Sequence, residues 1–576
     1  MFLTGASRLA AVSALLIVSL CCQSQTVSVN LDNQVGTVPV HYGFEGTWID
    51  QDSSMFLQRY RTSNLNILRM QFPMFEFEPA NDNSNPENSV INFDFVSQAD
   101  VAYGKTTSFH RWFVAMRRQH PDLVFYLNIW DCANWLASTP NTFMLGASGA
   151  WPPTNYAEYS EIVRASLSWL VNDVGVPPSR VMFTFVNEPN SDPSFPTHAF
   201  EGDLNDLLAM AAAARAAADE VSPEIRMGGI EEVFQANLTR QFLNAGGDQY
   251  VDFLAFHVYQ IGASAINGMI TSIHDDLVGY NLPLYLSEMG DNDYGAGFLI
   301  NYDSEEAGIA LTRNLVRIWE LDLAGMVMFR FSNLYLNSPS LPLSGWTGYG
   351  LFEDWRGTNT NGEAYKLFPG FWAFANFYNH FTNGVIVQSA ESINRMEVLA
   401  VRGDSSLAIA AVNYSTSSRT LDFQLSGGAD FSRARVVDGL SAIVPFDSLS
   451  VSGGNFTYSV PGNSVRIFLL GEGSSLTGLG DNDPVESGLA VDFQFSLYPN
   501  PVNATATIEY ALQKAQKLSV VVMDIQGRVL ETLFRGNQDA GSHSMRLDGE
   551  GLASGIYFVR IAGESFAKTQ KLVLIK

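Results

Sequence analysis

Cysteine is scarce in this sequence, because the chain of 576 residues contains only three. Two of them, Cys21 and Cys22, lie in residues 1–25, where Arg8 precedes an apolar run at 9–20, as in a signal peptide. Removal of this segment would leave Cys132 as the one remaining thiol, so no internal disulfide is expected. The sequence also has no Cys/His cluster with zinc spacing and no glycine-rich phosphate loop, so neither a metal nor a cofactor is predicted.

Positive charge and long apolar runs are scarce as well. The chain has 33 Lys and Arg against 59 Asp and Glu, a net charge of −26, so nucleic acid and anionic membranes are poor candidate partners. No stretch reaches the roughly 18 apolar residues of a transmembrane helix, so no transmembrane segment is expected. Hydrophobic residues make up 46% of the chain, which is enough for large cores. The length predicts about two to four domains.

Eight short apolar segments alternate with helical patterns between residues 38 and 381. They begin at His41, Ile67, Leu123, Val181, Ile225, Val251, Pro283 and Ala324. Each is apolar on both faces, as a strand must be when it lies between a barrel interior and an outer ring of helices. The pattern predicts an α/β fold, a (β/α)8 TIM barrel. A doubly wound open sheet has the same alternation, but the count of eight and the polar residues at segment ends favour the barrel.

The pattern changes after residue 381. Short strands separated by Gly, Ser and Asn turns predict a β-sandwich over 382–470, and the early strand at 26–37 is expected to join it. Residues 471–490 are rich in Gly, Ser and Asp and are typical of a linker. Residues 491–576 then form a third unit, which is small and all-β.

Four motifs mark this last unit: LYPNP at 497–501, VMDIQGRVL at 522–530, LASGIYFVRI at 552–561 and the terminal KTQKLVLIK. Together they resemble the C-terminal sorting domain of the type IX secretion system. The resemblance implies that the type IX secretion machinery is a partner. It also implies a protein that is secreted, or attached to the cell surface, after outer-membrane translocation. The alternative is one more small β-sandwich or binding module.

Two glutamates stand at the ends of predicted barrel strands. Glu188, in Asn187-Glu188-Pro189, ends the fourth strand, and Glu288 ends the seventh. Side chains at the carboxyl ends of barrel strands line the active site. Glycoside hydrolysis uses two carboxyl groups, one protonated and one ionised, on either side of the scissile bond. A separation of about 5–5.5 Å gives retention of configuration, and a wider one gives inversion.

This arrangement resembles clan A of the glycoside hydrolases, whose members are retaining enzymes. The resemblance implies that Glu188 is the acid/base and Glu288 the nucleophile. The barrel-plus-sandwich plan is similar to the β-xylosidase, β-glucuronidase/heparanase and endo-β-1,6-glucanase branches, and some agarases share it.

The same resemblance implies roles for residues at other strand ends. Arg69, at the end of the second strand, would hydrogen-bond the nucleophile and keep it ionised. In His257-Val258-Tyr259, at the end of the sixth strand, the tyrosine would bond the nucleophile and the histidine would approach the substrate. Asn187 would bond the sugar 2-hydroxyl. As alternatives from the residues alone, Arg69 belongs to a surface ion pair, and His257 and Tyr259 are satisfied polar groups of the core.

The eighth strand departs from the clan pattern. It ends in Phe329-Arg330-Phe331 where a tryptophan is common, so Arg330 either meets a charged or densely hydroxylated sugar or is structural. Trp130 and Trp135, after the third strand, are candidate substrate-binding residues. Together with further aromatics near strand ends they would form a stacking row that favours a long polysaccharide: Trp48, Trp346, Tyr349 and Trp355.

Several rival carboxylates lie near strand ends one, two and five: Glu45, Glu76, Glu78, Glu231 and Glu232. They are interpreted as solvated or hydrogen-bonded loop groups. The sequence therefore predicts a secreted, retaining endo-β-glycosidase acting on a polysaccharide (β-glucan, xylan or agar-type galactan). The alternatives are an exo-β-glycosidase on oligosaccharides and a non-catalytic carbohydrate-binding surface protein. Loss of one glutamate would mark the latter, and both glutamates are present.

Overall fold

The structure is a computed structural model, and it divides into two compact units, residues 1–478 and 479–576. It describes residues 24–45, 63–72, 74–82, 85, 91–95, 108–130, 132–140, 148–190, 200–260, 262–291, 304–329, 367–382, 384–390, 393–428, 430–441, 445, 447–471, 495–498, 502, 505–512, 516–524, 528–539, 541–549, 551–563 and 567–575. All but the last two residues of the predicted signal peptide, and all but the first residue of the predicted linker, lie outside these ranges. Within them, no helix is long and apolar enough to cross a membrane.

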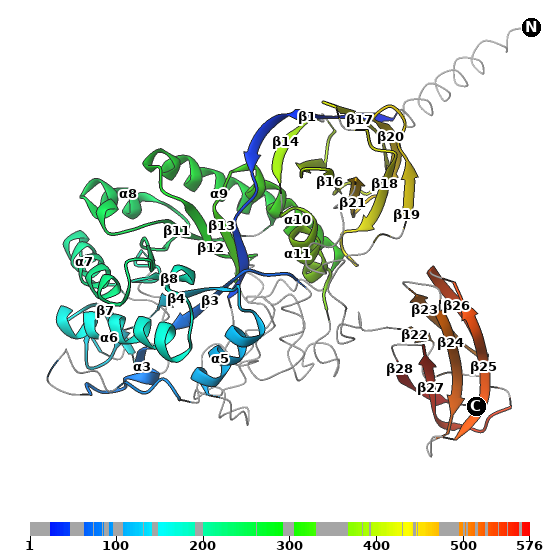
Figure 1. Cartoon of the computed structure of the whole chain (residues 1–576), viewed down its shortest axis with the longest axis horizontal. Helices are drawn as coiled ribbons and strands as arrows, with labels where there is room; N and C mark the ends of the chain where they lie inside the picture. The colour runs from blue at the N-terminus through cyan, green and yellow to red at the C-terminus, as the bar shows by residue number, and fades with distance from the viewer. Residues whose placement is uncertain are drawn as a thin grey trace, which may run out of the picture. The chain divides into compact units, whose positions relative to one another are not determined.

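A closed ring of parallel strands forms the centre of the barrel in the first unit. Its strands are β2 (His41–Glu45), β3 (Ile67–Phe72), β4 (Val124–Ile129), β8 (Val181–Thr184), β9 (Arg226–Gly228), β10 (Glu232–Val233), β11 (Leu254–Gln260), β12 (Leu284–Asp291) and β13 (Gly325–Met328). Figure 1 shows several of these strands, such as β3, β11 and β12, with helices beside them. The last strand pairs with the first, with Gly325 opposite His41. The predicted (β/α)8 barrel is therefore confirmed, and the open sheet is excluded.

The fifth barrel strand is broken into two pieces, β9 and β10. The first piece pairs with β8, and the second pairs with β11. A bridge between Gly228 and Phe253 completes the ring on this side. Glu231 lies in the break with a φ of 46°, so its backbone is in the left-handed region that few non-glycine residues adopt. The break leaves Glu231 between β9 and β10 with its side chain buried.

Helices pack around the ring of strands. They are α3 (Met74–Phe77), α5 (Phe109–Gln119), α6 (Tyr156–Ser168), α7 (Leu204–Val221), α8 (Asn237–Asn244), α9 (Ala263–Leu277), α10 (Glu305–Glu320) and α11 (Pro369–His380). Each longer helix buries one apolar face, as α9 does with Ile266, Ile270 and Ile273. Cys132 is buried within this barrel core and forms no disulfide among the described residues.

Gly43 in β2 allows two barrel strands to approach closely. A Cβ atom added there would lie 1.8 Å from the carbonyl oxygen of Ile67, its partner in β3. Because that oxygen belongs to a barrel strand, the clash cannot be relieved by a side-chain rotation. We expect Gly43→Ala to lower the free energy of unfolding by about 3 kcal/mol or more. Gly268 in α9 has nothing within 4 Å of its added Cβ, so Gly268→Ala should stabilise by about 0.5–1 kcal/mol. Equal urea midpoints for the two variants would contradict this account.

The β-sandwich is built from one long sheet in the order β19-β18-β21-β16-β15-β14-β1-β17-β20. These strands are β1 (Gln25–Thr37), β14 (Val385–Ala390), β15 (Met396–Arg402), β16 (Ser406–Asn413), β17 (Arg419–Ser426), β18 (Arg433–Asp438), β19 (Asp447–Ser450), β20 (Asn455–Val460) and β21 (Ser464–Gly471). The two ends of the sheet fold over each other, because Phe423 of β17 packs on Phe468 of β21 with ring centroids 4.8 Å apart. The N-terminal strand β1 pairs with both β14 and β17.

Helices α10 and α11 connect the barrel to the sandwich. Arg313 Nε in α10 donates to Glu397 Oε1 in β15 at 2.8 Å, and Asn376 Nδ2 in α11 donates to the carbonyl of Gly439 at 3.1 Å. Trp319 Nε1, also in α10, donates to the carbonyl of Phe381 at 3.0 Å. The first two contacts join these helices to the sandwich, and the third joins α10 to the end of α11.

The second unit is all-β, as predicted. A three-stranded sheet contains β22 (Phe495–Tyr498), β23 (Thr505–Leu512) and β26 (Gly541–Asp548). A four-stranded sheet contains β24 (Gln516–Met523), β25 (Val529–Gln538), β27 (Gly555–Ala562) and β28 (Ala567–Leu574). Its own apolar core draws residues from both sheets, including Ile508, Val520, Leu547 and Val559.

Candidate active site

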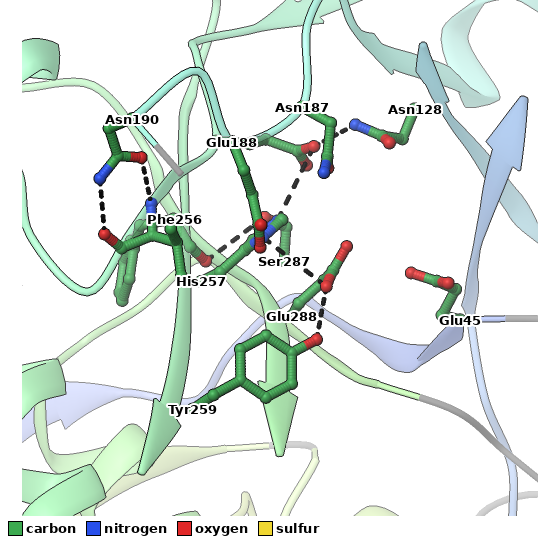
Figure 2. Close-up of polar contacts among 12 residues, drawn as sticks. Glu45, Asn128, Asn187, Glu188, Asn190, Phe256, His257, Tyr259, Ser287 and Glu288 are labelled. Atoms are coloured by element: carbon green, nitrogen blue, oxygen red, sulfur yellow. Dashed lines mark hydrogen bonds and ion pairs between the residues drawn. The ribbon is translucent and has the colours of Figure 1, made fainter. Parts of the chain in front are cut away.

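Polar side chains gather at the carboxyl ends of the barrel strands (Figure 2). The buried members are Glu45, Arg69, Asn128, Asn187, Glu188, Glu231, His257 and Glu288. Glu188 follows β8 and is 8% exposed, and Glu288 lies in β12 and is 4% exposed. One carboxylate oxygen of each lies within 4.8 Å of the other and of an imidazole nitrogen of His257. The fold thus brings together the two glutamates that the sequence singles out.

Arg69, in β3, is fully buried, and its guanidinium group contacts four of these side chains. Nη1 forms ion pairs with Glu45 and, at 2.6 Å, with Oε1 of Glu288. Nη2 donates to Asn187 Oδ1 at 3.1 Å and to Glu231 Oε2 at 2.8 Å. Burial disfavours the guanidinium charge, but the surrounding carboxylates raise the pKa of Arg69 well above its usual value. Glu288 therefore faces a permanent positive charge.

Tyr259 holds the other oxygen of Glu288. Its hydroxyl donates to Oε2 of Glu288. Burial and the negative charge of Glu288 raise the pKa of Tyr259 well above its usual value, so the hydroxyl keeps its proton. The two residues lie on adjacent parallel strands, β11 and β12, in a register that also pairs His257 with Glu288. Arg69 and Tyr259 thus both stabilise negative charge on Glu288.

His257 lies between the two glutamates. Its Nδ1 is 2.6 Å from Oε1 of Glu188 and 3.6 Å from Oε2 of Glu288. Its Nε2 faces Oε2 of Glu231 at 3.8 Å. Burial alone would lower the pKa of His257, but the charges of Glu288, Glu188 and Glu231 outweigh it and raise the pKa to about 10. The raised pKa favours the imidazolium form, in which Nδ1 donates to Glu188.

Glu231, one of the rival carboxylates near the end of the fifth strand, is a fourth carboxylate of the site. It is completely buried and accepts hydrogen bonds from Arg69, Tyr126 and Asn128. Burial would raise its pKa, but Arg69 and then His257 lower the pKa to about 2. Of the two interpretations, a solvated or a hydrogen-bonded loop group, the structure supports the hydrogen-bonded one, with Glu231 in the break between β9 and β10 where its backbone is left-handed.

The backbone around Glu188 is also unusual. Glu188 has a φ of 42°, in the left-handed region, and such conformations are often retained at functional sites despite their cost. Asn190, two residues later, locks this loop to β10: its Oδ1 accepts from the Val233 N–H at 2.9 Å and its Nδ2 donates to the Val233 carbonyl at 2.8 Å. Asn190 was not predicted from the sequence, although its position directly after the strand-end motif Asn187-Glu188-Pro189 could have indicated it.

Glu188, His257 and Glu288 are close enough together for a metal ion among the described residues. Two contacts argue against this interpretation. The Arg69 guanidinium lies 2.6 Å from Oε1 of Glu288 and would repel a nearby cation. His257 Nδ1 and Oε1 of Glu188 are hydrogen-bonded to each other at 2.6 Å, which engages both atoms in that contact. The geometry instead fits a pair of carboxyl groups that share protons.

The predicted substrate-binding aromatics are only partly placed. Trp130 is half-buried at the end of β4, and Trp135 packs against the barrel core while its Nε1 donates to the carbonyl of Glu78 at 3.0 Å. Arg330 lies outside the described residues, as do Trp48, Trp346, Tyr349 and Trp355. The stacking row therefore stays a prediction. Phe329, at the end of the eighth strand, packs edge-on against Tyr259 at 5.5 Å between ring centroids.

Three other rival carboxylates, Glu45, Glu78 and Glu232, are buried rather than solvated. Glu45 ends β2 and contacts Arg69, as described above. Glu232 accepts from the backbone N–H groups of Leu238 at 3.1 Å and Thr239 at 2.8 Å, so it binds the first turn of α8. The side chain of Glu76 lies outside the described part of the chain.

Glu78 belongs to a separate buried acidic group with Glu158 and Glu161. Burial, followed by the charges of Asp82 and Glu161, raises the pKa of Glu78 to about 8. Both of its carboxylate oxygens lack a hydrogen-bond partner among the described residues. The folded protein therefore binds a proton here more tightly than the unfolded chain does.

This group predicts that stability falls as pH rises. A carboxyl whose pKa is raised from 4.5 to about 8 on folding stabilises the fold below pH 4.5, and the stabilisation is lost as pH rises towards 8. We expect the unfolding free energy to drop by roughly 3 kcal/mol between pH 5 and 8 from this site, and Glu78→Gln to remove most of that drop. Exposed Glu224→Gln is the control and should keep the wild-type slope. Urea unfolding at pH 5 and at pH 8 measures the drop in unfolding free energy. The same drop in Glu78→Gln as in the wild type would contradict the prediction.

Residues 496–576 match the family described as the secretion system C-terminal sorting domain. The match covers the all-β second unit and agrees with the resemblance of its four motifs. It indicates that the protein is secreted through the type IX system to the cell surface or the extracellular space. Among curated proteins, none matches the sequence of this chain.

Solved structures match the barrel and sandwich. A family 30 subfamily 8 xylanase from Clostridium acetobutylicum has a TM-score of 0.54 and 15% identity, covering 77% of this chain and 99% of its own. A family 39 β-xylosidase from Caulobacter crescentus has a TM-score of 0.56 and 15% identity, covering 78% and 100%. A glucosidase from Croceicoccus marinus has a TM-score of 0.55 and 15% identity, covering 78% and 99%. The barrel and sandwich thus have the fold of clan A glycoside hydrolases.

Proposed function

We propose that the protein is a secreted, retaining glycoside hydrolase that works by double displacement. One observation carries the proposal: Glu188 and Glu288 present carboxylate oxygens within 4.8 Å of each other, from the ends of β8 and β12. Such a spacing suits direct attack on the sugar by one carboxylate, since an inverting pair must leave room for a water molecule. The different partners of the two glutamates then assign their roles.

Glu288 is the nucleophile in this proposal. Arg69 and Tyr259 hold its two oxygens and favour the anion, which attacks the anomeric carbon to form a glycosyl ester. As the ester forms, the charge on Glu288 is consumed. Arg69 is not left unpaired at that point, because Glu45 and Glu231 still neutralise it.

Glu188 is the acid/base in this proposal. Its partner is the His257 imidazole, with Nδ1 at 2.6 Å from Oε1 of Glu188. The site holds four carboxylates against Arg69 and His257, so a further proton is readily held by the Glu188–His257 pair. That proton passes to the leaving oxygen, and Glu188 then takes one from the water that hydrolyses the ester.

For the substrate, we propose a β-linked polysaccharide cut internally. Candidate polymers are β-glucan, agar-type galactan and xylan, and the xylanase and β-xylosidase among the structural matches make xylan the first to test. The test is release of reducing sugar from each polymer by the secreted protein, beside a Glu188→Gln/Glu288→Gln double variant. Activity of the wild type on one polymer, absent in the double variant, would support the proposal. Release of single sugars from the chain end would instead support exo action, and equal activity in the double variant would overturn the proposal.

A further inference from the structure

Glu231 pairs with Arg69, which contacts Glu288, and faces His257, which contacts Glu188. It is completely buried, with 0% of its surface exposed, so it cannot touch a sugar. Its carboxylate lies between the Arg69 guanidinium on one side and the His257 imidazole on the other. Tyr126 and Asn128 of β4 donate to the same carboxylate and fix its orientation. Neither the sorting-domain match nor the structural similarities assign this residue a role.

The contact with Arg69 is a two-point clamp. Arg69 Nε donates to Oε1 of Glu231 at 3.3 Å, and Nη2 donates to Oε2 at 2.8 Å. A carboxylate that binds this edge of a guanidinium fixes the plane of the whole group. The remaining nitrogen, Nη1, is therefore directed at Glu288, 2.6 Å away. Without the clamp, the guanidinium is free to rotate within the remaining carboxylates.

The contact with His257 acts on the other glutamate. His257 Nδ1 donates to Glu188, and Nε2 on the opposite edge of the ring faces Glu231 at 3.8 Å. An imidazole with a carboxylate at each edge is favoured as a cation. Three carboxylates face His257 from three elements: Glu188 after β8, Glu231 between β9 and β10, and Glu288 in β12. Arg69, Tyr259, Tyr126 and Glu45 are further titratable groups of the described residues that face this cluster.

We propose that Glu231 is a positioning residue that fixes Arg69 against Glu288 and holds His257 as a proton donor to Glu188. This rests on the function proposed above and deepens it. Glu231 acts only through these two side chains, and it stays ionised throughout the reaction because Arg69, Tyr126 and Asn128 all stabilise its charge. It sets the pH range over which Glu188 and His257 together keep their proton.

Replacing Glu231 with glutamine keeps the shape of the side chain and removes its charge. Every proton held by the cluster then becomes easier to lose, because one negative charge nearby is gone. We expect the alkaline limb of the kcat/KM profile to move to lower pH by at least one unit in Glu231→Gln, with roughly a 10-fold lower maximum from the loosened Arg69. Glu231→Asp keeps the charge and should restore the limb to its wild-type position.

The neighbouring residue supplies a matched control. Glu232 is equally buried, but it binds the first turn of α8 and makes no contact with Arg69 or His257 in the described structure. Glu232→Gln should therefore lower stability without moving the pH profile. If Glu231→Gln and Glu232→Gln give the same pH profile, the effect of Glu231 is merely structural and the inference is wrong.

A second measurement does not need a substrate. In protein labelled with ¹³C-histidine, the His257 signal, identified by its loss in His257→Asn, should titrate near pH 10 in the wild type. Its midpoint should fall by at least two units in Glu231→Gln and stay unchanged in Glu232→Gln. If this shift occurs but no sugar polymer is cut, the proposed function fails and the role of Glu231 stands. If a polymer is cut but the midpoint is the same in Glu231→Gln, the role of Glu231 fails alone.

Discussion

Glu288→Gln should lower kcat/KM by roughly 10⁴-fold or more, the largest loss expected from any single substitution in this chain. The amide is too weak a nucleophile to form a glycosyl ester, so the first step of double displacement stops. The expected measurement is the initial rate of reducing-sugar release on the polymer that the wild type cuts.

The variant should fold normally, and this makes the result interpretable. Arg69 keeps the carboxylates of Glu45 and Glu231 when the charge at position 288 is removed, so it is not left as an unpaired buried cation. The thermal midpoint of Glu288→Gln should stay within a few degrees of the wild type. A folded Glu288→Gln protein that retained more than about one tenth of the wild-type rate would contradict the assignment of the nucleophile.

Glu188→Gln should lower kcat/KM on a polymer by roughly 10² to 10⁴-fold, because the leaving oxygen no longer receives a proton. The loss should depend on the leaving group. An aryl glycoside whose phenol leaves without protonation needs no acid in the first step, so its glycosyl ester should still form quickly. The ester should then accumulate, because the second step still needs Glu188 as a base.

The contrast between the two variants separates the two roles. Stopped-flow measurement of phenol release should show a burst in Glu188→Gln with an activated aryl glycoside and no burst in Glu288→Gln. A matching loss for activated and unactivated substrates in Glu188→Gln would show that Glu188 is not the acid.

Much of the architecture followed from the sequence because the barrel strands carry an unusually clear pattern. Each is apolar on both faces, so the eight segments could be counted, and Glu188 and Glu288 could be placed at the ends of the fourth and seventh. The count also put Arg69 and Tyr259 at strand ends, the resemblance to clan A implied that both contact the nucleophile, and the structure puts both in contact with Glu288. Their roles in catalysis stay predictions until the variants are measured.

Glu231 could not be placed in the same way. Glu231 and Glu232 are adjacent acids just beyond an apolar segment, and residue type and spacing do not tell which one enters the barrel. The decision lies in the backbone: the fifth strand breaks, Glu231 adopts a left-handed φ of 46°, and Glu232 turns to the start of α8. A kink of this kind leaves no periodic signal in the sequence.

Glu45 and Glu78 show a related limit. Charged residues are seldom fully buried unless paired, so an acid at a strand end is by default assigned to solvent. Glu45 is buried because Arg69 pairs with it across two strands, a contact between residues 24 positions apart. Glu78 is buried beside other acids, and no sequence rule predicts this arrangement. Its ionised form is disfavoured there, so the fold loses stability as the pH rises towards the raised pKa of Glu78.

The central claim is that Glu188 and Glu288 act as a retaining pair, and the anomer of the first product tests it most directly. Proton NMR during hydrolysis of a β-linked substrate should show the β-anomer of the new reducing end first, followed by slow conversion to the equilibrium mixture. Two successive inversions at the anomeric carbon produce this result. Initial appearance of the α-anomer would mean a single displacement by water, and it would contradict the nucleophilic role of Glu288.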